Sequence, residues 1–207
     1  MTSKELDVNA FLTALHHQRW DDHRYYHHSR INQSLHLLSA MGFLVAYALL
    51  FTDPAAAALV AWLWSMVSRQ AGHFFFEPKG FDTVNQVTHA YKEEIKVGYN
   101  LQRKVVLMGL WAAAPLLVWW QPTVAGLLTE PVDAWGWARN VGWVWLYVGL
   151  GALLVRVLQL YWQQDLYTGV VWATKIITDP FHDIKLYHKA PLHLMRGQLL
   201  DPGHRTS

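Results

Sequence analysis

Four long apolar segments alternate with polar segments along the chain. They run at about 35–51, 55–76, 105–128 and 141–162. Each is close to the ~20 residues that an α-helix needs to cross the ~30 Å of hydrocarbon in a bilayer. The pattern therefore predicts an all-α, polytopic membrane protein with four transmembrane helices, in a single membrane domain covering residues 1–207.

Short turn signals predict how these helices are connected. Thr52-Asp53-Pro54 separates the first two apolar segments, so we expect these two helices to form a tight antiparallel hairpin. Gln121-Pro122 lies within the third segment and is expected to interrupt or end that helix.

The polar segments predict the orientation of the helices. Nearly all Lys and Arg residues of the polar regions lie in segments 1–34, 77–104 and 163–207, whereas the two intervening loops contain only Arg139. The positive-inside rule therefore predicts that both termini and the long middle segment are cytoplasmic. These segments also contain apolar residues at helical spacing, which predicts amphipathic helices on the cytoplasmic face.

Composition agrees with this class and excludes others. The chain is 53% hydrophobic and only 15% charged, against about 25% charged in soluble domains. It has no Cys, which excludes disulfides, thiolate metal sites and thiol nucleophiles. The net charge of +2, without a basic stripe, predicts no nucleic-acid partner.

The histidines point to chemistry on one face of the membrane. All twelve lie in the predicted cytoplasmic segments or at adjacent helix ends. His28, Asn32 and His36 are spaced by four, so on a continuous helix they share one stripe. His73 and Glu77 are spaced likewise at the end of the second helix.

The hairpin predicts that His36 and His73 lie at the same depth and face each other. Neutral imidazoles next to a carboxylate suit a first-row transition metal such as Fe(II) or Zn(II). We therefore predict a metal site of His28, His36 and His73 on the cytoplasmic side, with coordination positions left open for catalysis.

Further residues are candidates around this site. His27 and His89 are possible additional metal ligands. Glu77 has three open interpretations, as a ligand, as a partner that orients His73, or as a surface carboxylate. Asn32 and Glu77 are the candidate catalytic residues, with Asn32 hydrogen-bonding a ligand or the substrate.

Two arginines within the apolar segments are candidates for binding a substrate carboxylate. Arg156 lies inside the fourth segment and Arg69 inside the second, where a charge costs ~2.5–3.5 kcal/mol on insertion scales. Arg156 has a simpler interpretation, in which its long side chain extends to the membrane–water interface and keeps its charge in water. In the tail, Asp179-Pro180 predicts a turn, and His182 and His188 are expected to be surface residues.

The two histidine motifs also resemble a known family. Tyr26-His27-His28, continuing to Asn32 and His36, followed after a hairpin by Gly72-His73 and Glu77, is similar to the Mpo1-like family of membrane proteins, over roughly 25–85. The resemblance implies an Fe(II)-dependent dioxygenase that shortens 2-hydroxy fatty acids by one carbon, with a fatty-acid-like lipid and O2 as its substrates.

Other functions remain open from the sequence alone. One is a lipid hydroxylase or desaturase with two irons, although such enzymes need about eight ligand histidines. A non-enzymatic haem or metal carrier is another, and a purely structural lipid-binding protein is a third. The sequence predicts no particular oligomeric state.

Overall fold

The computed structural model describes residues 8–201 except 78, 84 and 99, without the side chain of residue 101. The described part of the chain is all-α, as predicted, with 76% of the described residues in helices. The helices are α1 (Val8–Tyr26), α2 (Arg30–Leu49), α3 (Pro54–Val60), η1 (Ala61–Met66), α4 (Val67–Phe75), α5 (His89–Ile95), α6 (Leu101–Trp120), α7 (Ala134–Gln163), α8 (Leu166–Tyr187) and α9 (Ala190–Met195). Within the described residues, the β contacts are two isolated bridges.

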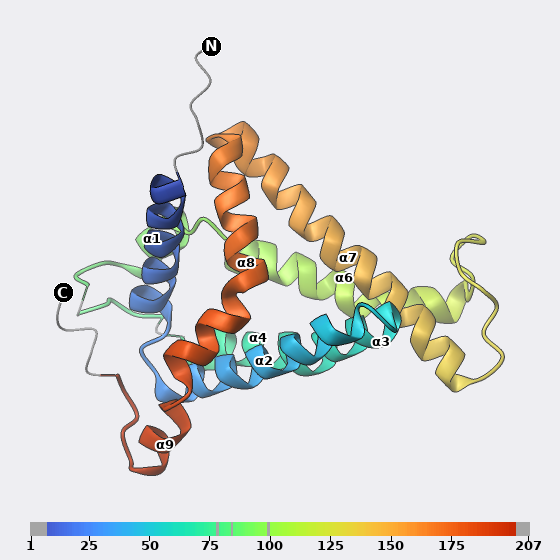
Figure 1. Cartoon of the computed structure of the whole chain (residues 1–207), viewed down its shortest axis with the longest axis horizontal. Coiled ribbons are helices and arrows are strands. Elements are labelled where there is room, and N and C mark those ends of the chain that lie inside the picture. The colour runs from blue at the N-terminus through green and yellow to red at the C-terminus, as the bar shows by residue number, and fades with distance from the viewer. Residues whose placement is uncertain (1–7, 78, 84, 99, 202–207) are drawn as a thin grey trace.

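The first two predicted helices form an antiparallel hairpin (Figure 1). One arm is α2, and the other is the run of α3, η1 and α4, whose middle turn is a π-helix. Asp53 caps the second arm by accepting a hydrogen bond from Ala56 N at 3.1 Å, and Pro54 occupies its first turn. The arms approach closely where Gly42 faces Ser65, because a Cβ on Gly42 would lie 2.4 Å from Ser65 Oγ.

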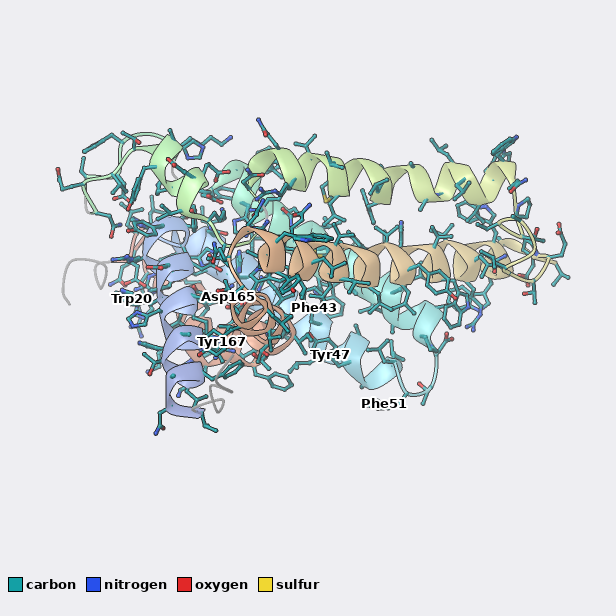
Figure 2. The ribbon with its side chains drawn as sticks, turned by 90° about the horizontal axis from the view of Figure 1, so that it is seen from above. Trp20, Phe43, Tyr47, Phe51, Asp165 and Tyr167 are labelled. Atoms are coloured by element: carbon teal, nitrogen blue, oxygen red, sulfur yellow. The ribbon has the colours of Figure 1, made fainter. Side chains whose placement is uncertain are left out.

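The helices α6 and α7 lie side by side (Figure 2). Both are long and apolar enough to cross a membrane, over Gln102–Trp120 and Ala134–Gln163. Trp145 of α7 connects α6 with the hairpin. Its indole donates to Trp111 O of α6 at 2.8 Å, and its carbonyl accepts from Trp62 Nε1 of η1 at 3.0 Å. The described residues therefore contain two candidate spans, which does not confirm the four-span prediction, and the hairpin packs against α7.

The boundaries of the later helices differ from the predicted ones. The third predicted segment, 105–128, is too long at its end, because α6 stops at Trp120 just before Gln121-Pro122. The fourth, 141–162, is too short at its start, because Asp133 caps α7 with a hydrogen bond from Gly136 N at 2.6 Å.

Helix α8 crosses from the end of α7 to the start of α2, and α1 lies beside it (Figure 1). The predicted turn at Asp179-Pro180 is wrong, because Pro180 lies inside α8. Two α1 residues attach to this helix, since Arg19 donates to Thr178 Oγ1 at 2.6 Å and Asp22 pairs with Lys175. Together α1 and α8 cover the end of the hairpin opposite its turn.

Candidate metal centre

Three histidines from three different segments meet at this covered end. His27 follows α1, His36 lies in the second turn of α2, and His73 lies in the last turn of α4. Each offers a ring nitrogen within 4.8 Å of the others. The ring centroid of His36 lies 4.1 Å from that of His27 and 4.9 Å from that of His73. We call His27, His36 and His73 the histidine trio.

Local hydrogen bonds explain why His27 reaches the trio. The chain between α1 and α2 is not helical, and two amides in the first turn of α2 hold its carbonyls. Asn32 Nδ2 donates to Tyr26 O at 2.9 Å, and Gln33 Nε2 donates to His27 O at 2.8 Å. Ser29 caps α2 by accepting from Ile31 N at 3.2 Å. The start of α2 thus fixes the backbone of His27.

His73 is oriented by a carboxylate. Its Nδ1 lies 2.7 Å from Glu77 Oε2, one helical turn later. The other oxygen of Glu77 lies 3.5 Å from Lys96 Nζ, and both side chains are 7% exposed. When Nδ1 donates to the carboxylate, Nε2 carries the free lone pair that a metal requires. Of the three interpretations of Glu77, this geometry supports the partner that orients His73.

His27 is oriented by a phenol. Tyr187 Oη lies 2.8 Å from Nδ1 of His27 and 2.9 Å from Nδ1 of His23. Because one hydroxyl has one proton, it accepts from one ring and donates to the other. When Tyr187 Oη accepts from His27 Nδ1–H, the lone pair of the ring lies on His27 Nε2. Burial, followed by the nearby His36 and His23, lowers the pKa of His27 well below its usual value, which keeps the ring neutral.

His36 is next to a buried ion pair. Its Nδ1 lies 3.6 Å from Asp183 Oδ2, and the same oxygen accepts from Arg69 Nη2. Although burial alone would raise the pKa of Asp183, the nearby Arg69 and, to a smaller extent, His36 lower this pKa below its usual value. A charged carboxylate therefore faces the outer edge of the His36 ring.

The inner nitrogens of the trio fit a metal ion. Within the described part of the chain, His27 Nε2 and both ring nitrogens of His36 are buried without a hydrogen-bond partner. A buried polar atom without a partner costs roughly 1–3 kcal/mol. A cation between the rings would bind the lone pair of His27 Nε2 and that of one ring nitrogen of His36, whose other nitrogen carries the proton. The contacts of His73 with Glu77 and of His27 with Tyr187 match those that orient metal-bound histidines in proteins.

The structure does not bring His28, which was predicted as a ligand, into the trio. Its Nε2 contacts Arg24 O and lies 3.7 Å from Asp82 Oδ2. The helical spacing did not apply, because α2 begins at Arg30 and His28 precedes it. Outside the helix, the spacing of four residues no longer places His28 on the stripe of Asn32 and His36. His27, predicted as an additional ligand, therefore occupies the position expected for His28.

Other predicted residues lie around or away from the trio. Asn32 is fully buried and holds the backbone of Tyr26. His89 begins α5 and is not part of the trio. Arg156 donates two hydrogen bonds to Val97 O, at 3.0 and 2.6 Å, and so fastens the middle segment to α7. The structure thus does not bring Arg156 to the site.

The sequence reasoning missed Asp183 and Tyr187, which it placed in a surface tail. Both lie on one face of α8, where buried residues follow each other at intervals of four: Lys175, Asp179, Asp183 and Tyr187. This spacing was the available signal, but a polar stripe normally faces water. As expected, His188 is exposed, whereas His182 is half-buried and lines the cavity described next.

A cavity of about 440 Å³ extends from the trio into the apolar interior. This volume lies within the ~300–1,000 Å³ typical of ligand pockets. Its polar end includes the trio with Arg69, Asp183, Gln70 and Lys104, and its apolar walls include Phe43, Trp62, Leu107, Leu153 and Ile177. Phe43 and Tyr47 follow each other along α2 (Figure 2), and Tyr47 Oη donates to Ile177 O at 2.8 Å. The cavity is therefore amphipathic.

Comparisons with protein-family models, with curated proteins and with solved structures found no match.

We predict that Gly72→Ala will destabilise the site. A Cβ on Gly72 would lie 2.1 Å from Asn32 Oδ1, and Asn32 cannot retreat without breaking its bond to Tyr26 O. Overpacking of this kind costs about 1–3 kcal/mol. Thermal unfolding should show a lower midpoint. Gly109→Ala is the control, because nothing lies within 4 Å of its Cβ, and an unchanged midpoint for Gly72→Ala would contradict the packing.

Proposed function

We propose that the protein is a membrane-bound non-haem Fe(II) dioxygenase that shortens 2-hydroxy fatty acids by one carbon. One observation carries this proposal. The three imidazoles of the trio, two buried and that of His73 partly buried, lie at the polar end of a mostly apolar cavity, with ring nitrogens next to Tyr187, Asp183 and Glu77.

The ligand set favours a catalytic centre over a structural one. Three neutral histidines leave coordination positions for a substrate and for O2. When bound, Fe(II) supplies the redox and Lewis-acid chemistry that allows O2 to react at the hydroxyl-bearing carbon. The choice of iron and of a 2-hydroxy acid rests on the resemblance to the Mpo1-like family.

The same geometry favours one metal ion over two. Within the described residues, the trio is the one group of three or more His, Cys, Asp and Glu side chains close enough to share an ion. A di-iron hydroxylase or desaturase would need about eight ligand histidines, and the remaining histidines that the structure describes do not assemble into a second such group.

The chain's own residues would bind and position the substrate. The apolar walls of the cavity accept the alkyl chain and exclude water from the polar end. Glu77 and Tyr187 hold the rings of His73 and His27 in place, which makes them positioning residues. In this proposal, Asn32 acts through the backbone that carries His27 rather than on the substrate.

The membrane placement proposed here includes all four apolar segments. We suggest that α2 and the α3–η1–α4 arm cross the bilayer beside α6 and α7. Support comes from exposed apolar side chains on the hairpin, such as Leu38, Met41 and Leu63. The basic residues near α1, α5 and α8 support a cytoplasmic location for this end and for both termini.

Oxygen consumption by the purified protein tests the function. We expect about one iron per chain and Fe(II)-dependent O2 uptake with 2-hydroxypalmitate. The C1–C2 bond breaks, C2 becomes the carboxyl carbon of pentadecanoate, and C1 leaves as CO2, with one O2 consumed and one water formed. Mass spectrometry should detect pentadecanoate, and palmitate is the control substrate. A Soret absorption band, or stoichiometric iron without product, would contradict the proposal.

A further inference from the structure

The cations that line the cavity differ in how their charges are neutralised. Arg69 pairs with Asp183, Lys96 with Glu77 and Glu93, and Lys175 with Asp22 and Asp179. Arg19 lies 3.4 Å from Asp179. In contrast, no carboxylate in the described part of the chain lies within ion-pair distance of Lys104, which also lines the cavity. Among the described residues that line the cavity, Lys104 is therefore the basic side chain left for an anionic ligand.

Lys104 lines the same cavity as the trio. It is in the first turn of α6, where the positive end of the helix dipole favours a bound anion. An anion bound at Lys104 would therefore share the cavity with the histidine nitrogens.

Gln70 provides a second polar group at the same end. It lies one turn before His73 and is 8% exposed. Its Oε1 is buried, lines the same cavity and has no hydrogen-bond partner among the described residues. A buried acceptor of this kind is stabilised by a ligand that brings an O–H or N–H donor.

We infer that Lys104 and Gln70 form the headgroup site of the substrate, in which Lys104 binds the carboxylate and Gln70 accepts a hydrogen bond from the 2-hydroxyl group. This inference rests on the proposed function and refines it. Arg69 was one of the two arginines that the sequence suggested for the carboxylate, but its charge is already balanced by Asp183. Lys104 therefore selects acids over esters, and Gln70 selects 2-hydroxy acids over unsubstituted acids.

Ligand binding to the metal-free protein tests this site without turnover. The chelator-treated protein is titrated with 2-hydroxypalmitic acid, its methyl ester and palmitic acid, and the fluorescence of the Trp residues that line the cavity is followed. A hydrogen bond to a charged group contributes about 1.5–3 kcal/mol, which corresponds to roughly ten-fold or more in affinity. We expect wild type to prefer the acid over the ester by about this factor.

Substitutions at Lys104 and Gln70 separate the roles of the two residues. Lys104→Met should abolish the preference for the acid over the ester, whereas Lys104→Arg should keep it. Gln70→Leu should remove the preference for the 2-hydroxy acid over palmitic acid, about three- to ten-fold for a neutral hydrogen bond. Arg103→Met is the matched control, because Arg103 is adjacent in the chain but does not line the cavity.

The outcomes distinguish this inference from the proposed function. Unchanged discrimination in a folded Lys104→Met protein, with O2 uptake by wild type, would overturn the headgroup site alone. Discrimination that depends on Lys104, without iron-dependent O2 uptake, would support the headgroup site and overturn the proposed reaction. Absence of any binding preference in wild type would overturn the headgroup site directly.

Discussion

Replacing any member of the histidine trio by alanine should abolish stoichiometric iron binding, whereas His28→Ala should retain it. Each ring of the trio offers one of three converging nitrogens. Loss of a group that only orients a ligand already costs about 10–100-fold in metal affinity, so loss of a ligand should cost more. Iron per chain, measured after gel filtration, gives the result.

The pair His27→Ala and His28→Ala is the sharpest form of this experiment. The residues are adjacent, and each has its own polar contacts, with Tyr187 for His27 and with Asp82 for His28. The sequence pattern alone expects His28→Ala to lose the metal. From the structure, we expect His27→Ala to lose the metal. Circular dichroism should confirm that both variants are folded, and loss of iron from His28→Ala alone would refute the trio.

Local signals explain what could be predicted of the fold and the site. The Thr52-Asp53-Pro54 turn contains its own cap and helix start, so the hairpin and the shared depth of His36 and His73 follow from sequence. The break between α1 and α2 also had a local signal, because Ser29 is a favourable N-cap before an apolar run. A helix start at Arg30 would have put His28 outside the stripe.

Tertiary contacts explain what could not be predicted. The stripe from Lys175 to Tyr187 is polar and becomes buried only because α8 packs against α2 and α1. Asp183 and Tyr187 reach the trio from more than a hundred residues away in sequence, and no local pattern encodes such contacts. The turn predicted at Pro180 failed for the same reason, because the position of this proline inside a long helix depends on those tertiary contacts.

Lys175→Met should destabilise the protein more than any other substitution on α8. Lys175 Nζ pairs with Asp22 of α1 and lies 2.9 Å from Asp179, and its side chain is 6% exposed. Although burial opposes the charge, Asp179 and Asp22 raise the pKa of Lys175 above its usual value. Removing one partner of a buried ion pair costs about 3–5 kcal/mol, because the remaining charge is left without compensation.

Thermal unfolding would show this loss as a midpoint lower by roughly 6–12 °C for about 3 kcal/mol, by the scaling known for soluble domains of similar length. Lys185→Met is the control, because Lys185 is on the same helix but exposed. Iron affinity should also fall, because His27 directly follows α1. Equal midpoints for the two variants would contradict the attachment of α1 to α8.

Adding Asp22→Asn to Lys175→Met should restore part of the lost stability. The double variant removes the carboxylate that Lys175→Met leaves uncompensated on α1, and Asp179 keeps its contact with Arg19 at 3.4 Å. A buried ion pair replaced as a whole is often neutral, whereas a broken one is costly. Recovery of the midpoint without recovery of iron affinity would show that the salt bridge positions His27 as well as stabilising the fold.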